Sequence, residues 1–271
     1  MLDPFVLGSI RYSFGVLAFI AILWLAEGRQ ALRYNGRFLP AAVAGLFGFC
    51  CFNVFVWLGL VYTRPEHASI IMVLQTPMIA MWVWLMRGAR PAPFTVGCIA
   101  FVIAGVLLVV TKGDLSQVVG GSLRGDFIVL AGAVSWVIYT LMSTRFAGWS
   151  PLRMTVLTCI PGTVALLAVN VFTVVMGYSS IPTLDAVLSV KWQILYFVVF
   201  TVVLGVLGFN NGVKLLGPLN AMLTLNLIPV VVFGIEIWLG RSFSAIEIGG
   251  AVLVVCALSV NNLYMRRAAG R

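Results

Sequence analysis

The chain has 271 residues, of which 62% are apolar and only 9% are charged, and its net charge is +9. Its mean hydropathy is +1.09. A soluble domain has about 25% charged residues, so the composition excludes a water-soluble protein and predicts an all-α integral membrane protein solvated mostly by lipid.

A helix needs about 20 apolar residues to cross the hydrocarbon core of a bilayer. By this criterion the sequence contains nine candidate spans: 4–26, 39–61, 66–86, 93–111, 126–147, 152–177, 192–213, 219–239 and 244–265. The first span is too long for the apolar region of a signal peptide and lacks a basic flank before it. The connections are short, so no soluble domain is expected.

The basic residues are distributed unevenly between alternate loops. One set of loops holds eleven of them and the opposite set holds five. Basic residues accumulate on the cytoplasmic side of a membrane. The first set is therefore predicted to be cytoplasmic. The C-terminus would then lie on the cytoplasmic side of a bacterial-type inner (plasma) membrane, and Met1 on the opposite side. Because the net charge reflects orientation in this way, no nucleic-acid partner is expected.

A repeat links the third span to the eighth. The segment 63–88 reads TRPEHASIIMVLQTPMIAMWVWLMRG, and the segment 216–240 reads LGPLNAMLTLNLIPVVVFGIEIWLG. A shift of 152 residues places Pro77 on Pro229, Gly88 on Gly240 and Gly97 on Gly249. The predicted topology inserts the two copies in opposite senses, which is the inverted-repeat plan of secondary transporters. The chain therefore divides into a first inverted repeat of four spans, 1–111, and a second of five spans, 126–265.

Pro77 and Pro229 lie near the middle of their predicted spans. Proline has no backbone N–H, so each removes one helical hydrogen bond and favours a kink. A gating or substrate-binding role at these positions and a simple kink without substrate contact are both consistent with the sequence.

Three motifs resemble a known family. The stretch 125–145, GDFIVLAGAVSWVIYTLMSTR, resembles the first helix of an EamA repeat. The segments TPMIAMWVWLMRG and IPVVVFGIEIWLG, each followed by a Gly-rich apolar span, resemble the last two helices of that repeat. The chain thus resembles the EamA-type members of the drug/metabolite transporter superfamily. This resemblance implies ten helices in two inverted halves of five, and export or exchange of small metabolites, amino acids among them. The sequence departs from the family where an acidic residue usually follows the fourth helix, since Ala89 and Arg241 stand there.

The first repeat has one span fewer than the second. The span 126–147 precedes 152–177, whereas nothing precedes the matching span 4–26. The positive-inside rule also indicates a further span before the first one, because it places Met1 on the outer side of the membrane. We therefore expect one more transmembrane helix upstream in the natural protein, which would make ten.

Polar residues at bilayer depth are costly and are therefore functional candidates. At helical spacing, His67, Gln75, Met78 and Trp82 fall on one face of the third span, and we expect this face to line a substrate cavity. The alternatives are a hydrogen bond from Gln75 to a neighbouring helix and a surface position for His67.

The helix predicted at 126–147 carries a second polar and aromatic face. Ser135, Trp136 and Tyr139 lie near its middle, away from the membrane edges where aromatic belts form. They suit the wall of a substrate pocket, with plain packing as the alternative. The other members of the predicted site are Asn53, Trp57, Asn220 and Thr224, with Asn210 and Asn211 as further amides.

Arg11 is the only basic residue well inside a predicted span. It could pair with a substrate carboxylate, although snorkelling or an ion pair with Glu236 or Asp126 is the favoured interpretation. A phosphorylated substrate would need several cations at this depth, so such substrates are disfavoured.

The chain has one histidine and scattered carboxylates, so neither a catalytic site nor a metal centre is predicted, and no cofactor is implied. The sequence predicts a secondary transporter that moves a small net-neutral molecule across the lipid bilayer by alternating access. Aromatic or other neutral amino acids are the expected exported cargo, with another metabolite or a drug as the alternative. A passive channel and an integral-membrane transferase are disfavoured.

Overall fold

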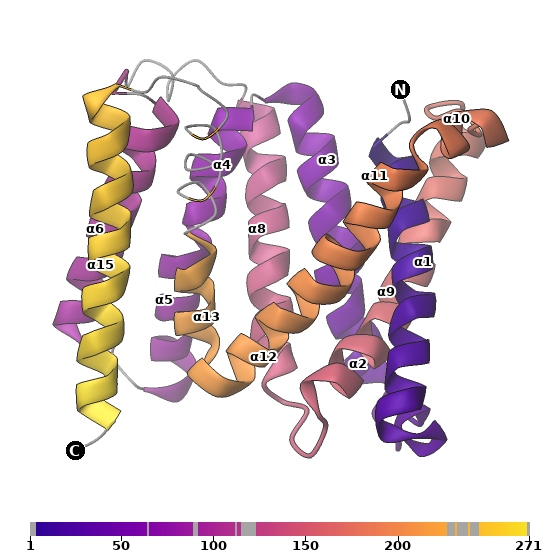
Figure 1. Ribbon diagram of the computed structural model, residues 1–271, viewed down its shortest axis with the longest axis horizontal. Coiled ribbons are helices and arrows are strands. Elements are labelled where there is room, and N and C mark those ends of the chain that lie inside the picture. Colours follow the sequence, from indigo (N-terminus) through magenta and orange to yellow (C-terminus); the bar gives the residue numbers. More distant parts are fainter. Residues whose placement is uncertain are drawn as a thin grey trace. The chain divides into compact units, whose positions relative to one another are not determined.

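The computed structural model describes residues 4–63, 65–88, 92–111, 113–114, 123–226, 231, 238 and 244–269. Within these residues all regular secondary structure is helical, as predicted (Figure 1). The elements are α1 (Pro4–Glu27), the 3₁₀ helix η1 (Arg29–Leu32), α2 (Phe38–Gly45), the π-helical η2 (Leu46–Cys51), α3 (Phe52–Tyr62), α4 (Pro65–Val73), α5 (Gln75–Arg87), α6 (Pro93–Thr111), α8 (Leu123–Ser143), α9 (Pro151–Val175), α10 (Leu184–Ser189), α11 (Lys191–Tyr196), the π-helical η3 (Phe197–Val206), α12 (Leu207–Leu216), α13 (Pro218–Leu225) and α15 (Ala245–Ala269).

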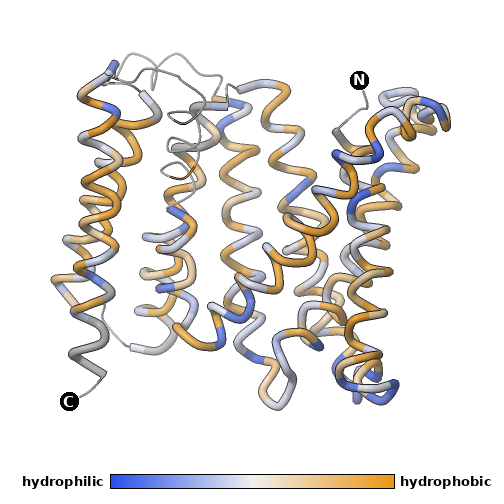
Figure 2. The backbone as a smooth tube through the Cα atoms, in the orientation of Figure 1, coloured by the Kyte–Doolittle hydropathy of each residue, from blue (hydrophilic) through white to orange (hydrophobic). Residues whose placement is uncertain are grey.

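Several of these helices have the length and composition of membrane spans. Five described stretches are long and apolar enough to cross a bilayer: Phe5–Glu27, Phe38–Tyr62, Leu123–Ser143, Pro151–Val175 and Lys191–Leu216. Shorter apolar helices cover Ile71–Leu85, Pro93–Val109 and Ala245–Asn261. Apolar residues dominate the helices (Figure 2), which lets lipid cover their outer faces.

The chain forms two compact units, each built from two separate stretches. Unit 1 comprises residues 1–57 and 134–215, and unit 2 comprises residues 58–133 and 216–271. Each unit therefore takes one stretch from each half of the sequence, and α3 and α8 contribute residues to both.

In unit 1, α1 packs against α9, η3 and α11, and α2 with η2 packs against α9. The approach of α2 to α9 requires glycine. A Cβ atom on Gly45 would lie 2.0 Å from the carbonyl oxygen of Thr158, and one on Gly162 would lie 2.4 Å from the carbonyl oxygen of Gly45. Small residues at such crossings let helix backbones touch, as is common in membrane proteins.

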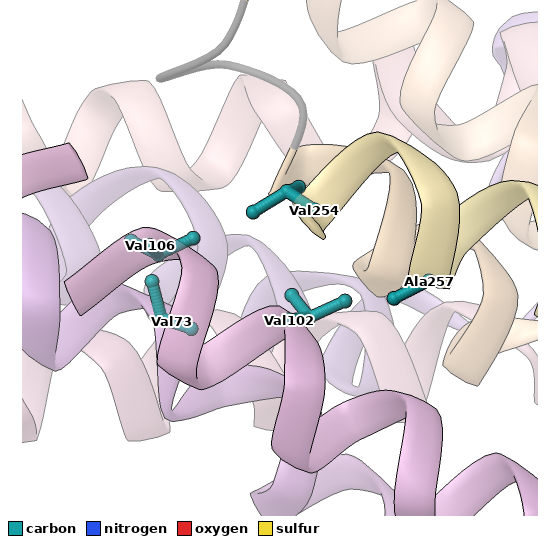
Figure 3. Close-up of a cluster of buried hydrophobic side chains, with 5 residues drawn as sticks. All are labelled: Val73, Val102, Val106, Val254 and Ala257. Carbon is teal, nitrogen blue, oxygen red and sulfur yellow. The ribbon is translucent and has the colours of Figure 1, made fainter. Parts of the chain in front are cut away.

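In unit 2, α6 and α15 run side by side, and α13 packs against α5 and α15 (Figure 1). The core around α6 and α15 is made of small aliphatic side chains: Val73, Val102, Val106, Val254 and Ala257 (Figure 3). Gly105 and Gly250 meet at this crossing, because a Cβ atom on either would lie within 2.8 Å of the other's carbonyl oxygen.

Two long helices of unit 1 contain π-helical stretches. A π turn closes i→i+5 hydrogen bonds and bulges the helix, and such turns are frequent at functional sites. The first, Leu46–Cys51, leads directly into the dipeptide Phe52-Asn53. The second, Phe197–Val206, precedes the same dipeptide, Phe209-Asn210, by two residues. Both dipeptides belong to the candidate site.

Candidate functional site

The predicted site residues fall into the two units. Unit 1 holds Asn53, Trp57, Ser135, Trp136 and Tyr139, and unit 2 holds Gln75, Pro77, Met78, Trp82, Asn220 and Thr224. The side chain of His67 and all of Pro229 lie outside the described residues. Each group is considered within its own unit.

An aromatic cluster surrounds Trp136 in unit 1. The ring of Trp136, on α8, lies 5.0 Å from that of Phe52, 5.2 Å from that of Tyr139 and 5.2 Å from that of Phe209, centroid to centroid. The series continues from Tyr139 through Phe49, at 5.3 Å, to Tyr12, at 5.8 Å. These separations are typical of favourable aromatic pairs. Residues from α1, η2, α3, α8 and α12 thus form one continuous aromatic wall.

Two asparagines tie this wall together. The Nδ2 of Asn210 donates to the hydroxyl oxygens of Tyr139, at 2.7 Å, and Thr155, at 2.8 Å. The Nδ2 of Asn53 donates to the hydroxyl of Tyr12, at 3.1 Å, and to the carbonyl of Phe49, at 2.9 Å. The two Phe-Asn dipeptides therefore act alike, since each phenylalanine packs on Trp136 and each asparagine bonds a tyrosine.

Two polar atoms of this cluster have no hydrogen-bond partner among the described residues. They are Nε1 of Trp136, a donor, and Oδ1 of Asn210, an acceptor. Trp136 is 9% exposed and Asn210 is 1% exposed. Leaving a buried polar group unsatisfied costs about 1–3 kcal/mol, and most such groups in native proteins find a partner. An aromatic wall with one free donor and one free acceptor has the chemistry needed to hold an uncharged polar or zwitterionic molecule.

Arg11 adds a charge to one end of this wall. Its Nη2 donates to Oδ1 of Asn53 at 2.9 Å, and its guanidinium carbon lies 5.0 Å from the ring centre of Tyr12 and 5.5 Å from that of Trp57. The sequence suggested Asp126 and Glu236 as ion-pair partners of Arg11, and no ion pair between Arg11 and either residue is described. Asp126 accepts a hydrogen bond from Thr63 within unit 2, and Glu236 lies outside the described residues.

In unit 2 one helix breaks and another ends at matching positions of the two sequence halves. The span expected at 66–86 is broken at Leu74, between α4 and α5, three residues before Pro77. The helix α13 ends at Leu225, and Asn226 stands three residues before Pro229. At both breaks the chain makes a tight 3₁₀ bond, from Leu74 N to Ile71 O and from Asn226 N to Leu223 O, each 3.1 Å long. The two breaks are 152 residues apart, the same shift that aligns the two halves of the sequence.

The two interruptions meet through side chains. The Nδ2 of Asn226 donates to Oγ1 of Thr76 at 2.9 Å, and both residues are buried. Gln75, predicted to line a cavity, is buried beside them and bonds Sδ of Met72 at 3.2 Å. Proline leaves a helical carbonyl without its usual donor. Buried hydrogen-bonding groups therefore gather where the backbone of each helix is interrupted.

The remaining predicted residues take varied positions. Ser135 is buried, Met78 is half-buried and Trp82 is 43% exposed. The amide of Asn220, on α13, donates to the carbonyl of Leu216 at the end of α12, and the hydroxyl of Thr224 donates to the carbonyl of Ala221 on its own helix. Gln75 and Trp82 both lie on α5, so the break at Leu74 does not separate them, and the face that they share is covered at Gln75 and open at Trp82.

Sequence reasoning does not single out Phe49, Phe52, Phe209, Thr76 or Asn226, which the structure adds to the two groups. The repeated Phe-Asn dipeptide is the signal that could have found the first group. Within the part of the chain that is described, no group of three His, Cys, Asp or Glu side chains gathers as a metal site would require.

Five described helices long and apolar enough to cross a bilayer define a multi-pass helical membrane protein. The model of the EamA-like transporter family matches residues 1–111 and 123–263. The chain belongs to this family of membrane transporters.

Relatives and a solved structure agree with this assignment. The chain is similar to the uncharacterized transporter YrdR of Bacillus subtilis (strain 168), with 27% identity over 98% of this chain and 84% of that protein. It is also similar to the uncharacterized transporter YyaM of the same organism, with 32% identity over 91% of this chain and 81% of that protein. One crystal structure aligns with a TM-score of 0.77 and 20% identity over 98% of this chain and 90% of that one, a likeness of fold.

Proposed function

We propose that this transporter exports a small net-neutral molecule with an aromatic or apolar part, namely an aromatic or other neutral amino acid. Its family makes it a transporter. The substrate class rests on one observation in unit 1, the free donor of Trp136 and the free acceptor of Asn210 within a wall of aromatic rings.

The physical argument for an amphipathic substrate is complementarity. Stacking on Trp136, Phe52 and Phe209 favours a flat or apolar group by dispersion and quadrupole interactions. The indole N–H and the amide oxygen each gain a hydrogen bond when a ligand supplies the missing partner. An amino acid offers both, since its carboxylate accepts and its ammonium donates.

Alternating access is supported by the paired helix breaks. Two discontinuous helices at equivalent positions of inverted repeats are the device by which many carriers change conformation around a site. The two stretches matched by the family model, 1–111 and 123–263, nearly coincide with the proposed repeats 1–111 and 126–265. The distribution of basic residues favours a C-terminus on the cytoplasmic side of an inner membrane.

The test is counterflow in proteoliposomes made from the purified full chain. Liposomes loaded with unlabelled L-phenylalanine, L-leucine, L-aspartate or L-lysine are given the same labelled compound outside. The proposal predicts transient accumulation with the first two and none with the charged pair. Uptake that trans-side substrate does not accelerate would indicate a channel. Counterflow only with a compound that is not an amino acid would replace the substrate class.

A further inference from the structure

Arg11 occupies an unusual position for a cation. It is the eighth residue of α1, so it lies about 10 Å along the helix from its first residue. The helix around it is one of the apolar stretches long enough to span a bilayer. A charge placed inside such a span is costly and normally has a partner or a function.

The surroundings of Arg11 hold its guanidinium in place without neutralising it. Asn53 is 3% exposed, and its amide is fully used, with Oδ1 accepting from Arg11 and Nδ2 donating to Tyr12 and Phe49. The rings of Tyr12 and Trp57 lie against the cation. The contacts that the described residues give Arg11 are thus all with uncharged groups, so its positive charge is positioned but not balanced within them.

The guanidinium also retains unused hydrogen-bonding capacity. It has five N–H donors in a planar fork. Its Nε is buried and has no hydrogen-bond partner among the described residues. A planar fork with a free Nε suits a carboxylate, which accepts two parallel charge-assisted bonds, better than a point-like or neutral acceptor.

Arg11 is joined to the aromatic wall by side chains already described. Asn53, which holds Arg11, follows Phe52, which packs on Trp136. Tyr12, which lies under Arg11, reaches Tyr139 through Phe49. A molecule with a carboxylate at one end and an apolar body at the other matches this order of groups.

We infer that Arg11 is the group that binds the carboxylate of the transported molecule, and that Asn53, Tyr12 and Trp57 position it for this role. The inference rests on the proposed function, which it deepens by making a carboxylate the determinant of specificity. An amino acid stripped of its carboxylate should then be a poor substrate even with its aromatic part intact.

Three probes with one aromatic part separate the groups of the substrate. They are L-phenylalanine, phenethylamine, which lacks the carboxylate, and 3-phenylpropionate, which lacks the amine. Transport in proteoliposomes and thermal stabilisation by each probe are measured for the wild-type protein, Arg11→Gln and Arg11→Lys. The matched control is Arg153→Gln, because Arg153 also lies over a ring, that of Trp149 at 5.0 Å, and also has a buried Nε without a partner among the described residues.

Arg11→Gln should raise the KM for L-phenylalanine about 10- to 100-fold, the usual effect of losing a hydrogen-bonded charge. The KM for phenethylamine should stay as it is. Arg11→Lys should fall between wild type and Arg11→Gln, and Arg153→Gln should bind all probes as wild type does. If Arg11→Gln does not fold, the test is made with Arg11→Lys. The ratio of its affinity for L-phenylalanine to its affinity for phenethylamine should be lower than in the wild-type protein.

The outcomes distinguish a failure of this inference from a failure of the proposed function. A wild-type protein that moves L-phenylalanine, with an unchanged preference over phenethylamine in the folded Arg11 variants, overturns the inference alone. A wild-type protein that refuses amino acids but binds 3-phenylpropionate in an Arg11-dependent way supports the inference and overturns the proposed substrate class. A protein stabilised by none of the three probes contradicts both.

Discussion

The interiors of the two units differ in the chemistry they bury. Unit 1 encloses large aromatic rings with amides between them, among them Phe49, Trp136, Tyr139, Asn53 and Asn210. Unit 2 encloses small aliphatic side chains where α6 crosses α15 (Figure 3). Of its buried amides, Gln75 and Asn226 lie beside Leu74 and at the end of α13, and Asn261 lies on α15. Both units consist mostly of apolar helices, so contact with lipid alone does not explain why unit 1 buries aromatic rings and unit 2 buries aliphatic side chains.

The difference suggests a division of tasks. Buried polar groups without partners reduce stability and are retained where a ligand supplies the partner. Among the described residues, six of the seven buried side-chain atoms without a partner lie in unit 1, and the seventh, Oδ1 of Asn261, lies in unit 2. Small residues and interrupted helices let backbones approach and bend, and unit 2 combines them. We interpret unit 1 as the part that recognises cargo and unit 2 as the part whose helices bend during transport.

The largest effect is expected at the helix crossing of unit 2. Leu at Gly250 would drive a side chain into the backbone of α6, because a Cβ atom there already lies 2.7 Å from the carbonyl oxygen of Gly105. We expect Gly250→Leu to lower the free energy of unfolding by about 3 kcal/mol or more. The measurement is thermal unfolding of the detergent-purified protein.

The neighbouring glycine provides the control. A Cβ atom on Gly249 would meet nothing within 4 Å, so Gly249→Leu should change stability by about 0.5 kcal/mol or less. Equal stability of the two variants would show that the α6–α15 packing described for unit 2 is wrong.

The next effect concerns the amide at the centre of unit 1. Asn210→Leu removes the bonds to Tyr139 and Thr155 and the free acceptor. We expect unfolding to become easier by about 1–3 kcal/mol and the KM for the cargo to rise about tenfold. Counterflow and thermal unfolding measure the two quantities on the same preparation.

The adjacent amide separates local from general effects. Asn211 bonds only the carbonyl of Leu207 on its own helix in the described contacts. Asn211→Leu should therefore leave the KM unchanged. A KM that rises equally in both variants would mean that the polar interior of unit 1 matters for folding and not for recognition.

The smallest effect is expected at the helix breaks. Thr76→Val and Asn226→Leu each remove one partner of the 2.9 Å bond between the two interrupted helices. In a double-mutant cycle the coupling should be about 1 kcal/mol, the net value of a typical buried hydrogen bond. Thr224→Val serves as control, because Thr224 bonds its own helix at Ala221. A coupling energy of zero between Thr76 and Asn226 would contradict the hydrogen bond described between these two side chains.

The sequence predicts some of this arrangement well and some of it not at all. Helical spacing places Ser135, Trp136 and Tyr139 on one face of 126–147, and all three side chains are buried, which fits both a pocket wall and plain packing. In the third span, helical spacing places Gln75 and Trp82 on one face of α5, but it does not reveal that Gln75 is buried while Trp82 is exposed, because exposure depends on which neighbouring helices cover that face.

Partners from distant segments lie beyond what periodicity can reveal. The bond from Asn210 to Tyr139 joins residues 71 positions apart, and that from Arg11 to Asn53 joins residues 42 apart. In a membrane helix every face is apolar, so the hydrophobic pattern says little about which face packs against which neighbouring helix. The π-helical stretches before the two Phe-Asn dipeptides likewise have no local signature such as proline.

The most direct test of the account is the KM for L-phenylalanine counterflow in Trp136→Phe compared with Trp149→Phe. Both tryptophans are buried in unit 1, but Trp149 stacks on Phe146, at 4.9 Å, outside the aromatic wall. Trp136→Phe keeps an aromatic ring and removes the free N–H, so its KM should rise about 3- to 10-fold, the value of one hydrogen bond, with the maximal rate retained. Trp149→Phe should match the wild type. A wild-type KM in Trp136→Phe, or the same increase in both variants, would contradict the claim that the aromatic wall of unit 1 binds the cargo.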